Sequence, residues 1–575
     1  MKRFLQPGLW PLLLAVCFVL TGCSTQHYRK SADKEAYGAI AQKSPLVKNM
    51  EEHFTIEQTN QFFLEGLPAT TNVEEFLGRD GELERGARVI SLEKALDIAV
   101  THSRIYQSQK EQLFLAALGL TLARHQFAPI FSAGGTASYN VNTAPVVDTV
   151  PDPTDPTGQR QIPVISDNLA ESRSFSASGQ SLGSILLSTG ARLSASFTSD
   201  FFRYLSGDPG TRVSSRVLGT LIQPLWRGAG YRVTMENLTQ SERNLLYALR
   251  NFTLFRKRFS VDVATAYYRV LQSRDVARNS YINLQSSRRN ADRTRALARE
   301  GRVTQADLGR LEQQELLAES QWIAGLNNYK QDLDSFKIQL GLSTDANIVL
   351  DDRDLEQLKI VHPDISVEES TKVALATRLD YQNLREQFED AGRKIGIAAN
   401  ALKAQVDLVA SAGIDSPQES STRFPVPDIN RYNWSAGLNL NLPLERKAER
   451  NAYRASLITY EAARRTFEQQ ADQIKLDVRN GWRALDQAKR NYEINEIGVK
   501  LAERRVEEQN LLAELGRARA QDQVDAQNAL NDSKNQLTQA LVSHTIARLQ
   551  FWNNLGILYI KDNGQWEEVA DAKSN

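Results

Sequence analysis

The residue pattern that most resembles a catalytic motif is Gly179-Gln180-Ser181-Leu182-Gly183, which fits the glycine-flanked serine of many hydrolases. In those enzymes the serine sits on a sharp turn between a strand and a helix. Here the stretch is rich in Ser and Gly, is typical of a strand and has no helix start after it. A hydrolase with Ser181 as its nucleophile is therefore the weakest of the hypotheses.

No other group of residues predicts an enzyme or a metal site. No glycine-rich phosphate loop follows a predicted strand, so we expect no nucleotide and no other cofactor. Lys and Arg total 69 and Asp and Glu total 69, so charge does not favour nucleic acid as a partner. The histidines show no metal-ligand spacing: His27, His53, His102, His125, His362 and His544.

An acidic pair is the strongest candidate for acting on ions. Asp522 and Asp525 are three residues apart, which places both carboxylates on one face of a helix. Two carboxylates on one helix face attract cations. The alternative is an ordinary solvated helix face.

The N-terminus predicts export and lipid attachment. Two basic residues precede an apolar run from Leu9 to Leu20, which is too short to span a bilayer as a helix. The following Leu20-Thr21-Gly22-Cys23 resembles the bacterial lipobox, so residues 1–22 are predicted to be a lipoprotein signal peptide and Cys23 the acylated (palmitate-bearing) residue. Ser24 resembles the outer-membrane sorting form. The alternative is a plain secretory signal with Cys23 incidental.

Long helices are predicted where proline is missing, between Pro224 and Pro363 and after Pro443. An unbroken helix over residues 231–300 would be roughly 105 Å long. A heptad-like seam runs through both blocks and predicts coiled-coil packing. Its first-block members include Val263, Val270, Ala277, Leu284 and Ala291, and its second-block members include Ile474, Val478, Leu485, Tyr492, Val499 and Val506.

The chain also contains an internal repeat. Ile90-Ser91-Leu92-Glu93 corresponds to Ile365-Ser366-Val367-Glu368, and Gly301-Arg302 corresponds to Gly516-Arg517. We expect five parts: the signal peptide over 1–22, a lipid-anchored segment over 23–89, a first repeat over 90–357, a second repeat over 358–560 and a tail over 561–575. The first repeat has strands within 128–225 and long helices over 231–340; the second has a hairpin within 405–444 and long helices over 445–556.

Period-two alternation predicts membrane-spanning strands in both repeats. The polar, proline-rich segments 143–170 and 415–430 are predicted to be loops. Two strands per repeat give four per chain, and four strands do not close a barrel, so we expect an oligomer. Segments 172–204 offer additional strand material, and the sequence leaves open whether it joins the barrel.

From about Ile90 to Ile560 the chain resembles the TolC-like outer-membrane efflux protein family. The resemblance rests on the two tandem halves and on Gln223-Pro224-Leu225-Trp226-Arg227-Gly228-Ala229-Gly230, which looks like the strand-to-helix junction of that family; Leu442-Pro443-Leu444-Glu445-Arg446 is its counterpart. It implies an α+β membrane protein in which a homotrimer forms one twelve-stranded transmembrane β-barrel and a long coiled-coil α-helical barrel. It also implies a non-enzymatic channel in the outer membrane, with its helical part in the periplasm.

The resemblance further implies partners and sites. A periplasmic adaptor protein, serving an inner-membrane transporter, would dock at the helical turns formed by Gly301-Arg302-Val303 and Gly516-Arg517-Ala518; the alternative is a plain interhelical turn. Asp522 and Asp525 match the family segment whose acidic residues ring the lumen at the periplasmic gate. The first turn has only Asp307, with Arg310 where the second carboxylate would be.

Two rival functions remain open at this stage. The same architecture serves as the outlet of a type I protein secretion system. A periplasmic coiled-coil lipoprotein with a soluble sheet and no pore would show the same helical seam.

Overall fold

The computed structural model describes residues 24–57, 64, 66–71, 73–151, 153–154, 156–157, 159, 161–206, 210–417, 425–515 and 517–567. The predicted signal peptide and Cys23 lie outside these residues. The chain divides into two compact units. A helical unit contains residues 1–118, 244–388 and 463–575, and a sheet unit contains residues 119–243 and 389–462.

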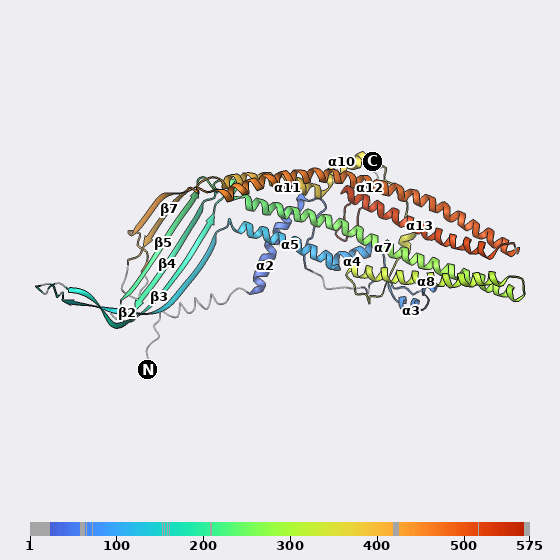
Figure 1. The fold of residues 1–575 in the computed structure, drawn as a ribbon, viewed down its shortest axis with the longest axis horizontal. Helices are drawn as coiled ribbons and strands as arrows, with labels where there is room; N and C mark the ends of the chain where they lie inside the picture. The colour runs from blue at the N-terminus through green and yellow to red at the C-terminus, as the bar shows by residue number, and fades with distance from the viewer. Residues whose placement is uncertain are drawn as a thin grey trace, which may run out of the picture. The chain divides into compact units, whose positions relative to one another are not determined.

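The sheet unit is built on one antiparallel sheet whose strands lie in the order β2-β3-β4-β5-β7-β8 (Figure 1). The strands are β2 (Ile130–Pro151), β3 (Gln161–Leu186), β4 (Arg192–Tyr204), β5 (Thr211–Pro224), β7 (Gln405–Asp415) and β8 (Tyr432–Asn441). β5 pairs with β7 although 180 residues separate them, so the strands of the two halves form one surface.

Two expectations about the strands were wrong. The sheet contains six strands and not four, because β3 and β4 lie between β2 and β5. Segment 143–170 is also not simply a loop, since β2 continues to Pro151 and β3 begins at Gln161. A register shift between Pro145 and Val147 lets the pairing continue past that proline.

The extended β2–β3 ribbon has no further partner strand among the described residues. Pairing of β3 with β4 ends at Ser174, whereas pairing of β3 with β2 continues to Gln161. Figure 1 shows this ribbon projecting beyond the rest of the sheet.

The helical unit contains two long hairpins. α7 (Glu236–Arg299) turns into α8 (Gln305–Leu340), and α12 (Lys447–Glu514) turns into α13 (Ala520–Leu555). The hairpins contact each other through Gln314 Nε2, which donates to Asn528 Oδ1 at 2.8 Å, and through Thr538 Oγ1, which donates to Asp275 Oδ2 at 2.7 Å. The shorter pairs are α4 (Leu92–His102) with α5 (Arg104–His125) and α10 (Val367–Thr377) with α11 (Leu379–Ala401). The chain passes from one unit to the other within four helices: α5, α7, α11 and α12.

The seam predicted in the first block is buried. Val263, Val270, Ala277, Leu284 and Ala291 are all shielded from solvent in α7. In α12 the seam is buried at Ile474, Val478 and Leu485 but only half-buried at Tyr492, Val499 and Val506. α12 therefore has a partly uncovered apolar face in the single chain.

The N-terminal segment is part of the helical unit and packs along its long helices. It contains α2 (Thr25–Lys43), η1 (Ser44–Leu46), η2 (Glu75–Asp80), α3 (Gly81–Glu84) and β1 (Arg88–Ile90), and β1 pairs in parallel with β6 (Ile348–Leu350). Buried Lys110 Nζ lies 2.7 Å from Glu51 Oε1, and Arg256 donates to the Asn49 carbonyl at 3.0 Å. Trp322 Nε1 donates to the Phe76 carbonyl at 2.7 Å. The remaining short helices are α6 (Tyr231–Thr234) and α9 (Arg353–Glu356).

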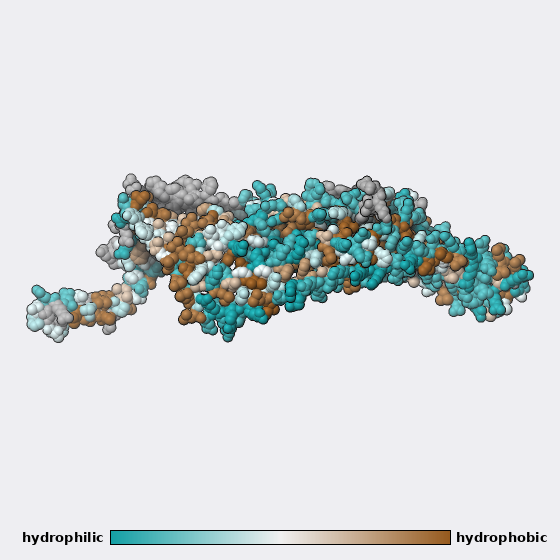
Figure 2. Space-filling view, turned by 90° about the horizontal axis from the view of Figure 1, so that it is seen from above, coloured by the Kyte–Doolittle hydropathy of each residue, from teal (hydrophilic) through white to brown (hydrophobic). Residues whose placement is uncertain are grey.

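Within the described part of the chain, every helix is either too short or too polar to cross a membrane. Figure 2 shows mostly hydrophilic side chains over the helical hairpins on the face that it displays.

Candidate functional site

One face of the sheet is apolar across all six strands. The register aligns alternate residues of every strand, so each row continues into the next. Phe131, Trp434 and Leu438 on this face are 81%, 72% and 68% exposed. The apolar rows contain Phe131, Ala133, Ala137 and Tyr139 in β2; Phe175, Ala177 and Ile185 in β3; Leu193, Ala195, Phe197 and Phe201 in β4; Val213, Val217 and Leu221 in β5; Val406, Leu408, Ala410, Ala412 and Ile414 in β7; and Tyr432, Trp434, Ala436, Leu438 and Leu440 in β8.

The opposite face is mostly polar over the same strands, and its apolar members include Leu182, Phe202, Leu218, Ile222 and Val409. Hydroxyls form cross-strand hydrogen bonds between Ser138 and Ser176 at 2.7 Å and between Ser411 and Ser435 at 2.8 Å. Arg216 lies 3.3 Å from Asp415. Further members of this face are Ser132, Thr136 and Asn140 in β2; Ser174, Ser178 and Gln180 in β3; Ser194, Ser196, Thr198 and Asp200 in β4; Arg212, Ser214 and Thr220 in β5; and Asn433, Asn439 and Asn441 in β8.

This division of the sheet is suited to separating hydrocarbon from water. An exposed apolar surface spanning six strands is unfavourable in water but favourable against lipid. The serine, threonine and asparagine side chains of the other face bind water and polar solutes. The sheet can therefore form part of the wall of an aqueous pore in a membrane.

Ser181 has no catalytic surroundings in this sheet. It lies in the middle of β3, between Ala133 of β2 and Phe197 of β4 in the register. The strand-to-helix turn that a hydrolase nucleophile needs is therefore missing at this serine.

The predicted strand-to-helix junction is held by hydrogen bonds to and from its backbone. The Leu225 N–H donates to the Val406 carbonyl at 2.7 Å, and the Gly228 N–H donates to Asn400 Oδ1 at 2.8 Å. Gly228 has φ +80°, a left-handed conformation that glycine tolerates best. In the counterpart segment, Arg446 donates to the carbonyls of Pro443 and Leu402. Asn400 and Arg446 thus join strand ends to the adjoining chain.

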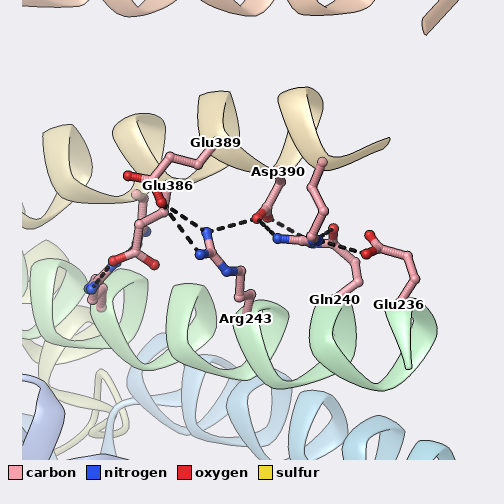
Figure 3. Close-up of polar contacts among 9 residues, drawn as sticks. Glu236, Gln240, Arg243, Glu386, Glu389 and Asp390 are labelled. Carbon is pink, nitrogen blue, oxygen red and sulfur yellow. Dashed lines mark hydrogen bonds and ion pairs between the residues drawn. The ribbon is translucent and has the colours of Figure 1, made fainter. Parts of the chain in front are cut away.

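An ionic cluster in the sheet unit links the first residues of α7 to the middle of α11 (Figure 3). Asp390 is 3% exposed, and its Oδ1 lies 2.8 Å from both Arg243 Nη1 and Arg393 Nη1. Gln240 Nε2 donates to Asp390 Oδ2 at 3.1 Å, and Arg393 Nε donates to Glu236 Oε2 at 2.7 Å. α7 follows β5 and α11 precedes β7, so the cluster ties the helices that adjoin two paired strands. The sequence does not single out Asp390, because it is one of many charged residues on helix α11.

The first predicted docking turn is an ordered helix end. Gly301 has φ +69°, and its N–H donates to the Ala298 carbonyl while the Arg302 N–H donates to Leu297, which is the hydrogen bonding of a glycine-terminated helix. Arg302 is exposed, with Nη1 3.8 Å from Glu300, and Val303 is half-buried. Gly301 therefore ends α7, as predicted.

The second turn is described only in part, because Gly516 lies outside the described residues. Arg517 is exposed and Ala518 is half-buried. The N–H groups of Arg517 and Ala518 both donate to the Leu512 carbonyl, at 2.9 and 3.2 Å.

The two acidic candidates lie on α13 and are both exposed. Asp522 is in the first turn of the helix, and Asp525 Oδ1 accepts a 2.8 Å hydrogen bond from Gln521. Asp307 has a different role at the first turn, because Thr304 Oγ1 accepts from its N–H and donates to its carboxylate at 2.7 Å. Asp307 is thus part of a helix cap, and within the described chain the exposed acidic pair belongs to the second hairpin alone.

His544 is a titratable group that sequence reasoning missed. It is fully buried in α13, and neither ring nitrogen has a hydrogen-bond partner. Burial, reinforced by Arg548, His362 and Lys489, lowers the pKa of His544 to about 4 from an ordinary 6.5. Six dispersed histidines carry no sequence signal that singles this one out.

This buried histidine predicts a pH-dependent stability. Because its folded pKa is below its unfolded pKa, its contribution is complete above pH 6.5 and is lost as pH falls toward 4. Between pH 7.5 and pH 5 we expect a loss of about 2 kcal/mol in the free energy of unfolding from this group. Denaturant midpoints at the two pH values measure the loss. The His544→Leu variant should show a pH effect smaller by that amount, and an identical effect in both proteins would contradict the assignment.

No family model matches the chain, and no curated protein matches it. Solved structures do match over most of its length. The Campylobacter jejuni CmeC outer membrane channel is 12% identical with a TM-score of 0.58, covering 91% of this chain and 96% of that one. The Vibrio cholerae outer membrane protein VceC is 14% identical with a TM-score of 0.55, covering 81% and 96%. The open state of the Neisseria gonorrhoeae MtrE outer membrane channel is 12% identical with a TM-score of 0.54, covering 89% and 100%.

Proposed function

We propose that this chain, which has the fold of the TolC-like outer-membrane channels, is itself an outer-membrane efflux channel. It passes solutes that an inner-membrane transporter delivers through a periplasmic adaptor, and it catalyses no reaction. The observation that carries the proposal is the two-faced sheet, with an exposed apolar surface on one side and hydroxyl, amide and charged groups on the other.

The functional molecule in this proposal is a homotrimer. A six-stranded open sheet has two unpaired edges, which are not stable in hydrocarbon and require neighbouring copies. The partly uncovered apolar surface of α12 supports the same conclusion for the helical unit, where Ile494, Leu501 and Leu511 are all more than half exposed. The sheet would cross the outer membrane, and the helical hairpins would lie in the periplasm.

The remaining sites are assigned within this proposal. The adaptor docks at the turns around Gly301-Arg302-Val303 and Gly516-Arg517-Ala518. Cys23 carries the lipid that anchors residues 23–89 to the outer membrane, and the two repeats at 90–357 and 358–560 supply equivalent hairpins.

The first test is single-channel current from the purified trimer in a planar bilayer. Discrete, uniform steps are expected from a pore. If a folded trimer gives no current, and a variant loosened at the Gly516 turn also gives none, the result would favour the non-pore lipoprotein. Transport assays distinguish efflux of small solutes from a type I secretion outlet, because only the latter releases an unfolded polypeptide.

A gate role for the acidic pair makes a separate prediction. In a trimer the exposed carboxylates of Asp522 and Asp525 would place six negative charges around the periplasmic end of the pore. We expect the double variant Asp522→Asn with Asp525→Asn to weaken block by a trivalent cation at least about tenfold, which corresponds to about 1.4 kcal/mol. Asp307→Asn is the matched control, because that carboxylate accepts a hydrogen bond from Thr304, the N-cap residue of α8. Block that responds equally in both variants would remove the gate assignment.

A further inference from the structure

The two additional strands β3 and β4 occupy the centre of the sheet. β3 pairs with β2 along one edge and with β4 along the other, from Ser174–Leu186 to Arg192–Tyr204. β4 in turn pairs with β5 over Arg192–Arg203. Removing β3 and β4 from the wall would separate β2 from β5, so they are not an appendage at one edge.

The same two strands continue both surfaces of the sheet. Ala177, Phe197 and Phe201 lie in the apolar rows, next to Ala137 of β2 and Val213 of β5 in the register. Their neighbours in sequence, including Ser178 and Ser196, lie in the polar rows. A flap folded away from the membrane would not need a pattern that matches the wall on both faces.

β8 and the Ile130–Ala144 part of β2 lack the features that protect a free edge. Soluble proteins commonly place charged residues or proline on edge strands to prevent pairing with another chain. Here neither β8 (Tyr432–Asn441) nor the Ile130–Ala144 part of β2 contains a charged residue or a proline. The charges lie on the inner strands, at Asp200, Arg216 and Asp415 among others. This inverted distribution indicates that both edges are covered by a strand.

The direction of the strands determines which strand can pair with the two edges of the sheet. Each of the six is antiparallel to its neighbour, and because their number is even, β2 and β8 run in opposite directions. In a ring of identical copies, β8 of one copy therefore meets β2 of the next in the same antiparallel arrangement. The uncharged edges would pair antiparallel, and the apolar face of one copy would continue into the apolar face of the next.

We propose that every chain contributes all six strands to the wall, so that three copies close an eighteen-stranded barrel through β8–β2 pairing between copies. This inference rests on the proposed trimeric channel. At a strand spacing of about 4.8 Å and a tilt of about 40°, the backbone diameter is about 36 Å, compared with about 24 Å for four strands per chain. The membrane part of this channel is thus wide enough for an aqueous pore that excludes few small solutes.

Cysteine labelling in intact outer membranes tests the position of β4. On β4, Ala195→Cys lies in an apolar row and Ser196→Cys in a polar row; on β7, Ala410→Cys and Ser411→Cys are the matched pair. We expect both alanine positions to react with a lipid-soluble maleimide and not with a charged one, and both serine positions to react with the charged reagent. The unchanged chain gives the background from its own cysteines.

The outcomes separate this inference from the proposed function. If Ala195→Cys reacts with the charged reagent while Ala410→Cys does not, β4 lies outside the wall and the eighteen-stranded barrel is wrong. If both alanine positions react with the charged reagent, the sheet does not face lipid and the channel proposal itself fails. Native mass spectrometry gives the number of copies. Three copies with the expected labelling support eighteen strands, and two copies would overturn that number.

Discussion

Replacing Asp390 by asparagine should destabilise the folded chain by about 3 kcal/mol. The carboxylate is nearly inaccessible to water, and its Oδ1 lies 2.8 Å from a nitrogen of Arg243 and of Arg393. The asparagine keeps the shape and can still accept from Gln240, but Arg243 and Arg393 each lose their buried counter-charge and keep the carboxylates of Glu389 and Glu236 respectively. Each arginine is roughly one-quarter exposed, which limits the loss because water reaches both. Denaturant unfolding followed by circular dichroism measures the change.

The adjacent residue provides a control for this prediction. Glu389 contacts the same Arg243 at 3.4 Å, but its side chain is 53% exposed. An exposed pair of this kind contributes little, so Glu389→Gln should change stability by no more than about 0.5 kcal/mol. Equal effects of the two substitutions would mean that burial does not determine the strength of this cluster.

The second large effect is expected at Gly341, which ends α8. Its φ is +85°, and a Cβ added there would lie 2.2 Å from the His102 carbonyl oxygen and 3.0 Å from the Ser103 nitrogen. Both atoms belong to the backbone between α4 and α5, so no side-chain rotation relieves the contact. Strain from the left-handed conformation together with overpacking predicts that Gly341→Ala lowers the free energy of unfolding by about 2–5 kcal/mol.

Two other helix-ending glycines form a graded control series. A Cβ at Gly556, which ends α13, would lie 3.1 Å from Thr377 Oγ1 and 3.3 Å from the Arg378 backbone. A Cβ at Gly301 would meet nothing within 4 Å, so Gly301→Ala carries only the conformational penalty of about 1 kcal/mol. The expected order of destabilisation is Gly341, then Gly556, then Gly301. A Gly301→Ala variant as unstable as Gly341→Ala would show that steric contact is not the cause.

Helix positions were predictable because they depend on local rules. The absence of proline and the heptad spacing predicted both long hairpins, and the glycines at 301, 341 and 556 occupy left-handed positions at helix ends. The matching turns at Gly301 and Gly516 are 215 residues apart. The same spacing separates α8 from α13 at both ends. The period-two alternation likewise located β7 and β8.

Strand number was harder to predict because pairing is not local. The prolines at 145, 151 and 163 suggested a loop, but a register shift and the position at a ribbon edge accommodate them. Ser174–Leu186 and Arg192–Tyr204 were recognisable as strand material, yet only the register shows that they separate β2 from β5.

The sequence by itself determined the parts that depend on the order of neighbouring residues: the long helices, their glycine ends and the alternating strands. Tertiary structure alone decided which residues meet across long separations. It placed β5 beside β7, set Arg243 against Asp390 and buried His544 without a partner. The physical reason is that helix caps and strand alternation are set over a few residues, whereas burial, ion pairing and strand order depend on segments more than one hundred residues apart.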